Sequence, residues 1–208
     1  MQEIFHNIWA GLIGGSRLDV ANLVLGIAGV WLMVRLSLWA FPVGLAAVIV
    51  QAKLFWQARL YADAAVQVFF FVALAYGWWH WVRGRGAAPE LPVTRLTWGA
   101  RLLVVGITVD AALLWALCLL GWTNDVMPFR DAFIAAFSVA GQVLQARKNI
   151  ENWPVWIAVD LVAIASYWQA DLAFTAFLYA VYLALAFGGW RSWHRAMRAQ
   201  GAHVAQGA

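Results

Sequence analysis

Seven hydrophobic spans, each long enough or nearly long enough to cross a bilayer, most constrain what this chain can fold into. They cover residues 18–38, 42–58, 61–82, 98–121, 129–148, 153–169 and 171–190. A helix needs about 20 apolar residues to cross the hydrocarbon core of a membrane. The chain is 64% hydrophobic and 12% charged, which is more apolar surface than a water-soluble domain of this size can bury. We therefore predict an all-α integral membrane protein with seven transmembrane helices.

Basic residues are divided unequally between the two sides of the predicted bundle. The side reached after the first, third, fifth and seventh spans carries Arg83, Arg85, Arg95, Arg147, Lys148, Arg191, Arg195 and Arg198. The other side carries Arg17, Arg59 and Arg130 together with several acidic residues. Cytoplasmic ends of transmembrane helices are enriched in lysine and arginine. The charge pattern therefore indicates membrane topology rather than nucleic-acid binding, and it predicts an external N-terminus and a cytoplasmic C-terminus.

The first part of the sequence is repeated in its second half. Residues 19–81 align without a gap on residues 131–193, and 17 of these 63 positions are identical. FWQARL (55–60) falls on YWQADL (167–172). Three spans repeat, and the fourth span restores the chain direction between the copies, so both copies cross the membrane in the same sense. The pattern predicts two parallel three-helix repeats joined by a linker helix. Certain small transporters have this organisation, with the substrate site near the middle of the membrane between the repeats.

These boundaries divide the chain into five segments. They are an N-terminal interfacial segment (1–17), repeat 1 (18–82), a cytoplasmic loop with the linker helix (83–128), repeat 2 (129–193) and a cytoplasmic tail (194–208). The loop RGRGAAPELP (83–92) combines glycine, proline and charge and is the strongest candidate for an internal boundary. Trp56, Trp81, Trp168 and Trp193 occur in matched pairs at span ends, where we expect them in an interfacial aromatic belt.

Positions at which the repeats differ are the better functional candidates. Repeat 2 carries Gln142, Trp156 and Asp160 where repeat 1 carries Val30, Gly44 and Val48. An ionised carboxylate near the middle of a span costs at least about 3 kcal/mol to insert, so Asp160 needs a bound cation, a proton or a basic partner. Lys53 is one internal partner to consider. Asp110, in the fourth span and outside both repeats, is expected to make a contact of the linker helix.

Polar and aromatic side chains form stripes on several predicted helices. Asn149, Trp153, Trp156 and Asp160 have the spacing of one face of a continuous helix. Aromatic faces attract cations, and polar side chains in lipid face a cavity or one another. Interhelical hydrogen bonding remains the alternative for Gln67 and Gln142. We predict a site for a flat, positively charged heteroaromatic ligand at Gln67, Gln142, Asn149, Trp153, Trp156, Asp160, Tyr179 and Tyr182.

Other classes of protein receive less support from the sequence. The four histidines lie at span ends or in tails without metal-ligand spacing, and there is no glycine-rich phosphate loop or ATP-binding module. We therefore predict no enzyme activity, catalytic residue, metal or cofactor. A structural or receptor-like membrane subunit is a third class, and it would require Asp160 to be paired within the protein.

The chain resembles the PnuC family of vitamin transporters over nearly its whole length. The resemblance is carried by FPVG (41–44), LYADAAVQVFFFVALAYGWWHW (60–81) and ARKNIENWPVWIAVDLVAIASYW (146–168). It implies a bacterial inner-membrane protein with a seven-helix core of two three-helix repeats, similar to SWEET transporters (3+1+3). It also implies a homotrimer that takes up its substrate by facilitated diffusion, with a cytosolic kinase trapping the product by phosphorylation.

The resemblance leaves two substrates for this chain. The family is associated with nicotinamide riboside, and relatives with thiamine or riboflavin. Nicotinamide riboside and thiamine both contain a flat cationic ring, whereas riboflavin is neutral and is harder to reconcile with Asp160. We expect nicotinamide riboside, with thiamine as the alternative. Whether Asp160 is a counter-ion or a proton site stays open at this point.

Overall fold

The computed structural model describes residues 16–59, 61–84, 90–123 and 126–206, in which the regular structure is helical. The helices are α2 (Arg17–Val34), α3 (Ala40–Gln57), α4 (Tyr61–Arg83), α5 (Trp98–Trp122), α6 (Pro128–Ala146), α7 (Asn152–Gln169) and α8 (Ala173–Gln206). These seven helices correspond one to one with the predicted spans. The predicted N-terminal interfacial segment lies outside the described residues except for Ser16 and Arg17.

Five of the described helices, α2, α3, α4, α5 and α8, are long and apolar enough to cross a membrane. Together with the helical fold, they make this an all-α membrane protein. The remaining two, α6 and α7, contain polar residues such as Gln142, Gln145 and Asp160, which lower their mean hydropathy. α8 does not end near Trp190 as the seventh span did; it continues to Gln206, since neither proline nor a left-handed residue interrupts it.

We call α2–α4 and α6–α8 the two helix triplets. Left-handed residues end the first two helices of each triplet and place the turns between helices at matching positions. In the described residues, the non-glycine residues with positive φ are Leu36 (58°), Arg59 (61°), Lys148 (59°) and Asp171 (57°). In the alignment of the two repeats, Leu36 falls on Lys148 and Arg59 falls on Asp171. A left-handed residue just beyond a helix end stops the helix. The predicted spans 18–38 and 129–148 therefore ran too far, because their helices stop at Val34 and Ala146.

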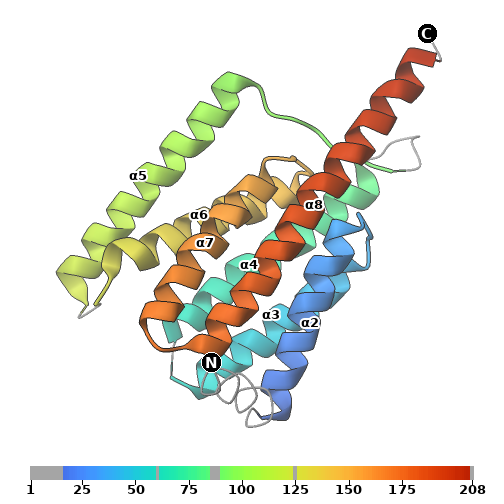
Figure 1. The fold of residues 1–208 in the computed structure, drawn as a ribbon. Coiled ribbons are helices and arrows are strands. Elements are labelled where there is room, and N and C mark those ends of the chain that lie inside the picture. Colours follow the sequence, from blue (N-terminus) through green and yellow to red (C-terminus); the bar gives the residue numbers. More distant parts are fainter. Residues whose placement is uncertain (1–15, 60, 85–89, 124–125, 207–208) are drawn as a thin grey trace.

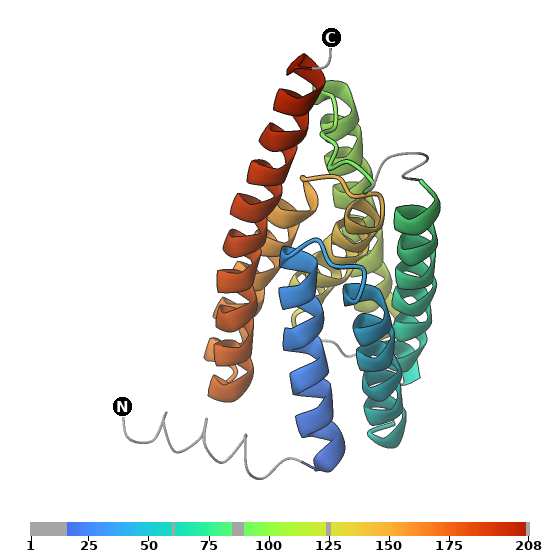
Figure 2. The ribbon, with the colours of Figure 1, turned by 90° about the vertical axis from the view of Figure 1, so that its right-hand side faces the viewer.

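Six of the helices form a closed ring, from which α5 stands apart. α2 packs on α3, α3 on α4, α4 on α6, α6 on α7, α7 on α8, and α8 returns to α2. α5 packs mainly against α6 and lies at the edge of the molecule in Figure 1. Figure 2 shows α2 and α8 side by side where the ring closes. Exchanging the two triplets converts the α4–α6 contact into the α8–α2 contact.

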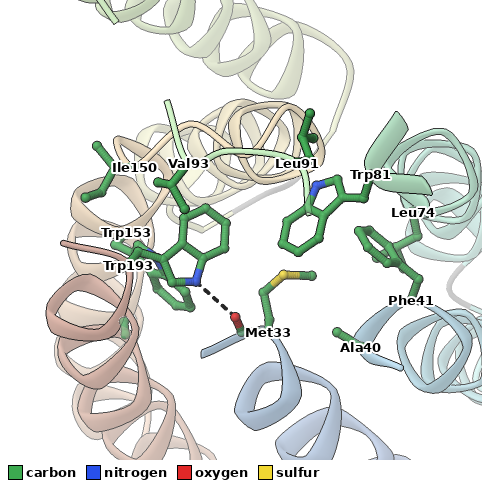
Figure 3. Close-up of a cluster of buried hydrophobic side chains, with 11 residues drawn as sticks. Met33, Ala40, Phe41, Leu74, Trp81, Leu91, Val93, Ile150, Trp153 and Trp193 are labelled. Carbon is green, nitrogen blue, oxygen red and sulfur yellow. Dashed lines mark hydrogen bonds between the residues drawn. The ribbon is translucent and has the colours of Figure 1, made fainter. Parts of the chain in front are cut away.

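One end of the ring is filled by a cluster of buried apolar side chains, which we call the core cluster (Figure 3). Its members are Met33, Ala40, Phe41, Leu74, Trp81, Leu91, Val93, Ile150, Trp153, Ala186 and Trp193. Met33 and Trp81 lie near the C-terminal ends of α2 and α4, whereas Phe41 and Trp153 lie in the first turns of α3 and α7. α2 and α4 therefore run toward this end, and α3 and α7 run away from it.

Two tryptophans tie the ring together at the core cluster. Trp81 Nε1 donates to the Ala146 carbonyl at 3.1 Å and joins α4 to α6, while Trp193 Nε1 donates to the Met33 carbonyl at 3.0 Å and joins α8 to α2. Their side chains are 2% and 0% exposed. The prediction that this pair lies in an interfacial belt is therefore wrong, because helix-end carbonyls provide acceptors inside the protein. Trp56 and Trp168 are exposed, as a belt position requires.

The segment between α4 and α5 is pinned against the turn between α6 and α7. Thr94 N donates to the Lys148 carbonyl, and Ile150 N donates to the Thr94 carbonyl. Leu91 and Val93 enter the core cluster. The second half of the connection between the helices is thus part of the packed structure and not a boundary between separate units, because its apolar side chains and backbone groups find partners there.

Lys148 is a buried lysine at the centre of this arrangement. It is 2% exposed, its Nζ donates to the Leu91 carbonyl at 2.6 Å, and Nζ lies 4.3 Å from the centre of the Trp81 ring. Burial lowers the pKa of Lys148 from 10.5 to about 8, although Glu90 acts in the opposite direction. The carbonyl and the indole face are therefore the contacts that retain the ammonium in an apolar setting.

Replacing Gly189 by alanine should destabilise the ring. A Cβ at Gly189 would overlap the Trp153 indole, a core-cluster residue, so we expect a loss of roughly 1–3 kcal/mol from overpacking. Gly106 in α5 is the control, since a Cβ there meets no atom within 4 Å. Thermal unfolding in detergent should show Gly189→Ala well below wild type and Gly106→Ala at or slightly above it. Equal stability of the two variants would contradict this packing.

Lys148→Met should change how stability depends on pH. Because the folded-state pKa is lowered, the unfolded chain binds a proton between about pH 8 and 10.5 that the folded chain does not bind. Lys148 therefore makes the free energy of unfolding rise with pH in that window. Thermal unfolding of wild type and Lys148→Met across that range should show a smaller rise in the variant. Parallel pH curves would contradict a lowered pKa.

Candidate functional site

A cavity of about 280 Å³ lies inside the six-helix ring, and every helix of the ring contributes to its wall. Met33, Ala40, Leu74, Trp153 and Ala186 belong both to its lining and to the core cluster. The core cluster therefore forms one end of the cavity. A concave, mostly apolar cavity with a few polar groups is the usual form of a small-molecule site.

The part of the cavity wall contributed by α2 and α3 consists of small, apolar residues. It includes Gly26, Gly29, Val30, Gly44 and Val48. A Cβ on Gly29 would lie 3.7 Å from the backbone of Gly44, so the two helices are in close contact there. Gly44 aligns with Trp156, and it leaves open in the first triplet the volume that an indole fills in the second.

The opposite wall, from α6, α7 and α8, is polar and aromatic. It contains Gln142, Gln145, Trp153, Trp156, Asp160, Tyr179 and Tyr182. The aligned positions in the first triplet carry no charged side chain, and only Gln67 among them has an amide. The cavity is therefore chemically two-sided, although the helices around it are arranged alike.

Trp156 is held from two directions. Its Nε1 donates to Gln145 Oε1 at 3.1 Å. A Cβ on Gly141 would lie 3.1 Å from Cε2 and 3.4 Å from Cδ2, the two atoms shared by the indole rings. Contact at these central atoms means that α6 packs against a face of the indole rather than its edge. The ring is therefore fixed on one side, and its other surface is available to the cavity.

Asp160 lies on the cavity wall and is 4% exposed. No basic side chain in the described residues comes within salt-bridge distance of its carboxylate. Tyr179 and Tyr182 line the same cavity, and their rings meet edge to face with centroids 6.1 Å apart. The Tyr182 hydroxyl reaches across to the backbone of Gly26 on α2. A carboxylate and two phenols thus form the polar centre of the cavity.

Gln142 supplies an unused donor to the same wall. Gln142 is 6% exposed, and its Nε2 is buried without a hydrogen-bond partner among the described residues. A buried amide N–H without a partner costs roughly 1–3 kcal/mol. A ligand with a carbonyl or hydroxyl oxygen would satisfy this group, so Gln142 is poised to accept such a ligand.

Six of the eight residues predicted for the site line this cavity, and two do not. Asn149 lies in the turn beyond α6, where the left-handed Lys148 takes it off the helical face, and its Nδ2 donates to Thr94 Oγ1 at 2.8 Å. Gln67 is half-buried on α4, seven residues and so about 10 Å along the helix from Leu74, which does line the cavity. The carboxylate Asp110 is exposed on α5.

Two further expectations differ from the structure. Lys53 is exposed on α3 and does not line the cavity, so it is not the internal partner of Asp160. Gln145 lines the cavity and binds Trp156, yet it was not among the predicted site residues. It lies three residues after Gln142 on α6, and that helical spacing is the signal that could have found it.

Comparisons with known proteins place this chain in a family. The sequence profile of the family described as nicotinamide mononucleotide transporter matches residues 16–195. The chain belongs to this family. Its relatives include the nicotinamide riboside transporter PnuC of Escherichia coli K12, 24% identical over 95% of this chain and 93% of PnuC. The members of this family are transporters and not enzymes. The apolar helices of the present chain are those of a multi-pass inner-membrane protein.

A second relative bears on the substrate, and a solved structure bears on the fold. The riboflavin/roseoflavin transporter RibM of Streptomyces davaonensis is 30% identical over 98% of this chain and 92% of RibM. The crystal structure of the vitamin B3 transporter PnuC has a TM-score of 0.74 and 20% identity, covering 94% of this chain and 90% of that one. The predicted resemblance to the PnuC family is confirmed, while the relatives carry different vitamins.

The contact between Gln145 and Trp156 can be tested by a double-mutant cycle. Gln145→Leu and Trp156→Phe each remove one partner of the bond, and each should lower the free energy of unfolding by roughly 1 kcal/mol. The double variant should lose less than the sum, because the second change removes a bond that is already broken. Thermal or chemical unfolding of the four proteins measures this coupling. Strict additivity would show that the bond does not form.

Proposed function

We propose that the chain carries a flat, cationic vitamin or vitamin precursor through the cavity, with nicotinamide riboside as the first candidate and thiamine as the alternative. The observation that carries this proposal is Asp160, a buried carboxylate on the cavity wall without a basic partner in the described residues. A ligand cation would supply the missing positive charge.

The surroundings of Asp160 suit a flat ring. Trp156 offers an indole surface one helical turn away on α7, and Tyr179 and Tyr182 offer phenol rings from α8. Aromatic faces add to the attraction of a cation, particularly where water is excluded. The donor at Gln142 would pair with a carbonyl or hydroxyl oxygen of the ligand. We propose Gln142, Trp153, Trp156, Asp160, Tyr179 and Tyr182 as the binding residues.

Riboflavin is a second candidate because RibM, a riboflavin transporter, is 30% identical to the chain. A neutral ring would leave an ionised Asp160 without a counter-charge. Transport of riboflavin would therefore require Asp160 to bind a proton and donate a hydrogen bond. The cationic candidates and the neutral riboflavin thus make opposite demands on the charge of the Asp160 side chain.

The architecture proposed for transport is a pair of parallel repeats, α2–α4 and α6–α8, joined by α5 in a 3+1+3, SWEET-like arrangement. The matched turns and the matched α4–α6 and α8–α2 contacts support it. The core cluster blocks the cavity at the end where α2 and α4 finish. Passage of a ligand would require this end to open while the other end closes, as in alternating access.

The proposed setting follows from charge and from the resemblance to PnuC. Arg83, Arg95, Arg147, Arg191 and Arg195 lie toward the core-cluster end, which we assign to the cytoplasm. The N-terminus is then outside and the C-terminus inside. We further propose facilitated diffusion by a homotrimer, with a cytosolic kinase trapping the substrate by phosphorylation.

Asp160→Asn should weaken binding of a cationic vitamin and spare the fold. We expect affinity for the substrate to fall at least tenfold, because the variant keeps the size and shape of the side chain but removes its charge. Calorimetry on the purified protein with nicotinamide riboside, thiamine and riboflavin measures this directly. Asp110→Asn is the control, since it removes a carboxylate that is exposed on α5.

The same ligand panel separates the alternatives. Loss of nicotinamide riboside or thiamine binding in Asp160→Asn, but not in Asp110→Asn, supports the counter-ion role. Riboflavin binding by wild type that survives in Asp160→Asn would favour the neutral candidate. A wild-type protein that binds none of the three would favour a structural or receptor-like subunit. Equal binding of the cation by wild type and Asp160→Asn would contradict the proposal.

A further inference from the structure

A second hollow lies outside the six-helix ring, between α5 and α8. It has a volume of about 270 Å³, and residues of α5, α6, α7 and α8 line it together with the connecting segments. Figure 1 shows the segment before α5 crossing from the side of α8 to the first turn of α5, so the two helices stand apart. We call this hollow the α5–α8 groove.

The groove combines an apolar lining with a basic one. Its apolar lining includes Val104 and Val105 of α5 and Pro154 and Val155 of α7. Its polar lining comprises Arg95, Arg101, Glu151 and His194. Apolar groups are thus next to cations at the end of the helices that we assign to the cytoplasm.

The basic surface continues along α8. Trp190 and His194 also line an adjoining hollow, whose other residues are Phe187, Arg191, Arg195 and Arg198. The spacing of these three arginines places them on one helical face. They are exposed, and none forms a salt bridge with a described carboxylate. At the aligned positions the first triplet carries Trp79, Arg83 and Gly86, so repeat symmetry does not account for the cluster.

Among the described residues that line the groove, Glu151 is the one acidic side chain, and half of its carboxylate is already used. Its Oε1 accepts from Arg101 Nη2 at 2.8 Å, Arg101 Nε at 3.0 Å and Leu96 N at 3.2 Å. Its Oε2 is buried and has no hydrogen-bond partner in the described part of the chain. The groove therefore offers uncompensated cations for an anion and one acceptor for a hydroxyl hydrogen.

We propose that the α5–α8 groove binds one anionic phospholipid whose headgroup carries a hydroxyl. Its acyl chain packs against Val104, Val105 and Val155, and its phosphate lies among Arg95, Arg191, Arg195 and Arg198. The headgroup hydroxyl donates to Glu151 Oε2. Basic pockets between transmembrane helices on the cytoplasmic side suit such lipids, because that leaflet is negatively charged.

The test compares two triple variants of the full chain purified in detergent. Arg191→Gln/Arg195→Gln/Arg198→Gln removes the cluster on α8. Arg35→Gln/Arg83→Gln/Arg147→Gln is the matched control, since it removes the same charge from exposed residues near helix ends outside the groove. Native mass spectrometry with phosphatidylglycerol, phosphatidic acid and phosphatidylcholine as probes measures lipid binding and oligomeric mass together. Unfolding curves confirm that both variants are folded.

We expect wild type and the control variant to retain one phosphatidylglycerol per chain in preference to phosphatidylcholine. The α8 variant should bind it roughly a hundredfold more weakly, since each of the three basic residues contributes about a fivefold gain in affinity. Phosphatidic acid, which lacks the headgroup hydroxyl, should bind more weakly than phosphatidylglycerol. Equal loss in both variants, or no loss in either, would overturn the proposal. A change in oligomeric mass without a change in lipid binding would also overturn it, by showing that the groove is an interface between copies.

Discussion

Two indole N–H groups close the six-helix ring, and the cavity exists because the ring is closed. Trp81 bonds to the end of α6 and Trp193 bonds to the end of α2. In the interior of a membrane protein a helix-end carbonyl without water must find a donor in the protein. These bonds provide it at corresponding places in the ring. They also hold the core cluster together, which in turn forms one end of the cavity.

A nearly symmetric frame thus encloses an asymmetric cavity. The frame requires first and second helices of similar length, left-handed turns and close glycine contacts in both triplets, and these features recur at a fixed interval. The cavity wall is free of that requirement, so one side carries Gly44 and Val48 where the other carries Trp156 and Asp160. The turns also differ: the α6–α7 turn is pinned by Thr94 and contains the buried Lys148, whereas Trp39 in the α2–α3 turn is 70% exposed.

The sequence predicted the helices and most of the candidate site, because the length of a hydrophobic span and the register of a repeat can both be recognised without knowing the fold. Comparison of the repeats isolated Asp160 and Trp156, since a costly residue in one copy only is not needed by the frame. The helical spacing failed at Asn149, where the left-handed Lys148 turns the side chain off the helical face. Gln67 shows a different limit: it aligns with Tyr179, which lines the cavity, yet Gln67 itself does not. The burial of Trp81 and Lys148 depends on Ala146 and Leu91, partners so distant along the chain that no local pattern reveals them.

A structure of the protein in complex with nicotinamide riboside would test most directly whether the ring cavity is a cation site. The pyridinium ring is expected beside Trp156, facing the Gly29 and Gly44 wall, with its positive charge next to the Asp160 carboxylate. The carboxamide or ribose oxygens are expected near Gln142 Nε2. A ligand bound outside the ring, or within it with the pyridinium turned away from Asp160, would contradict that assignment.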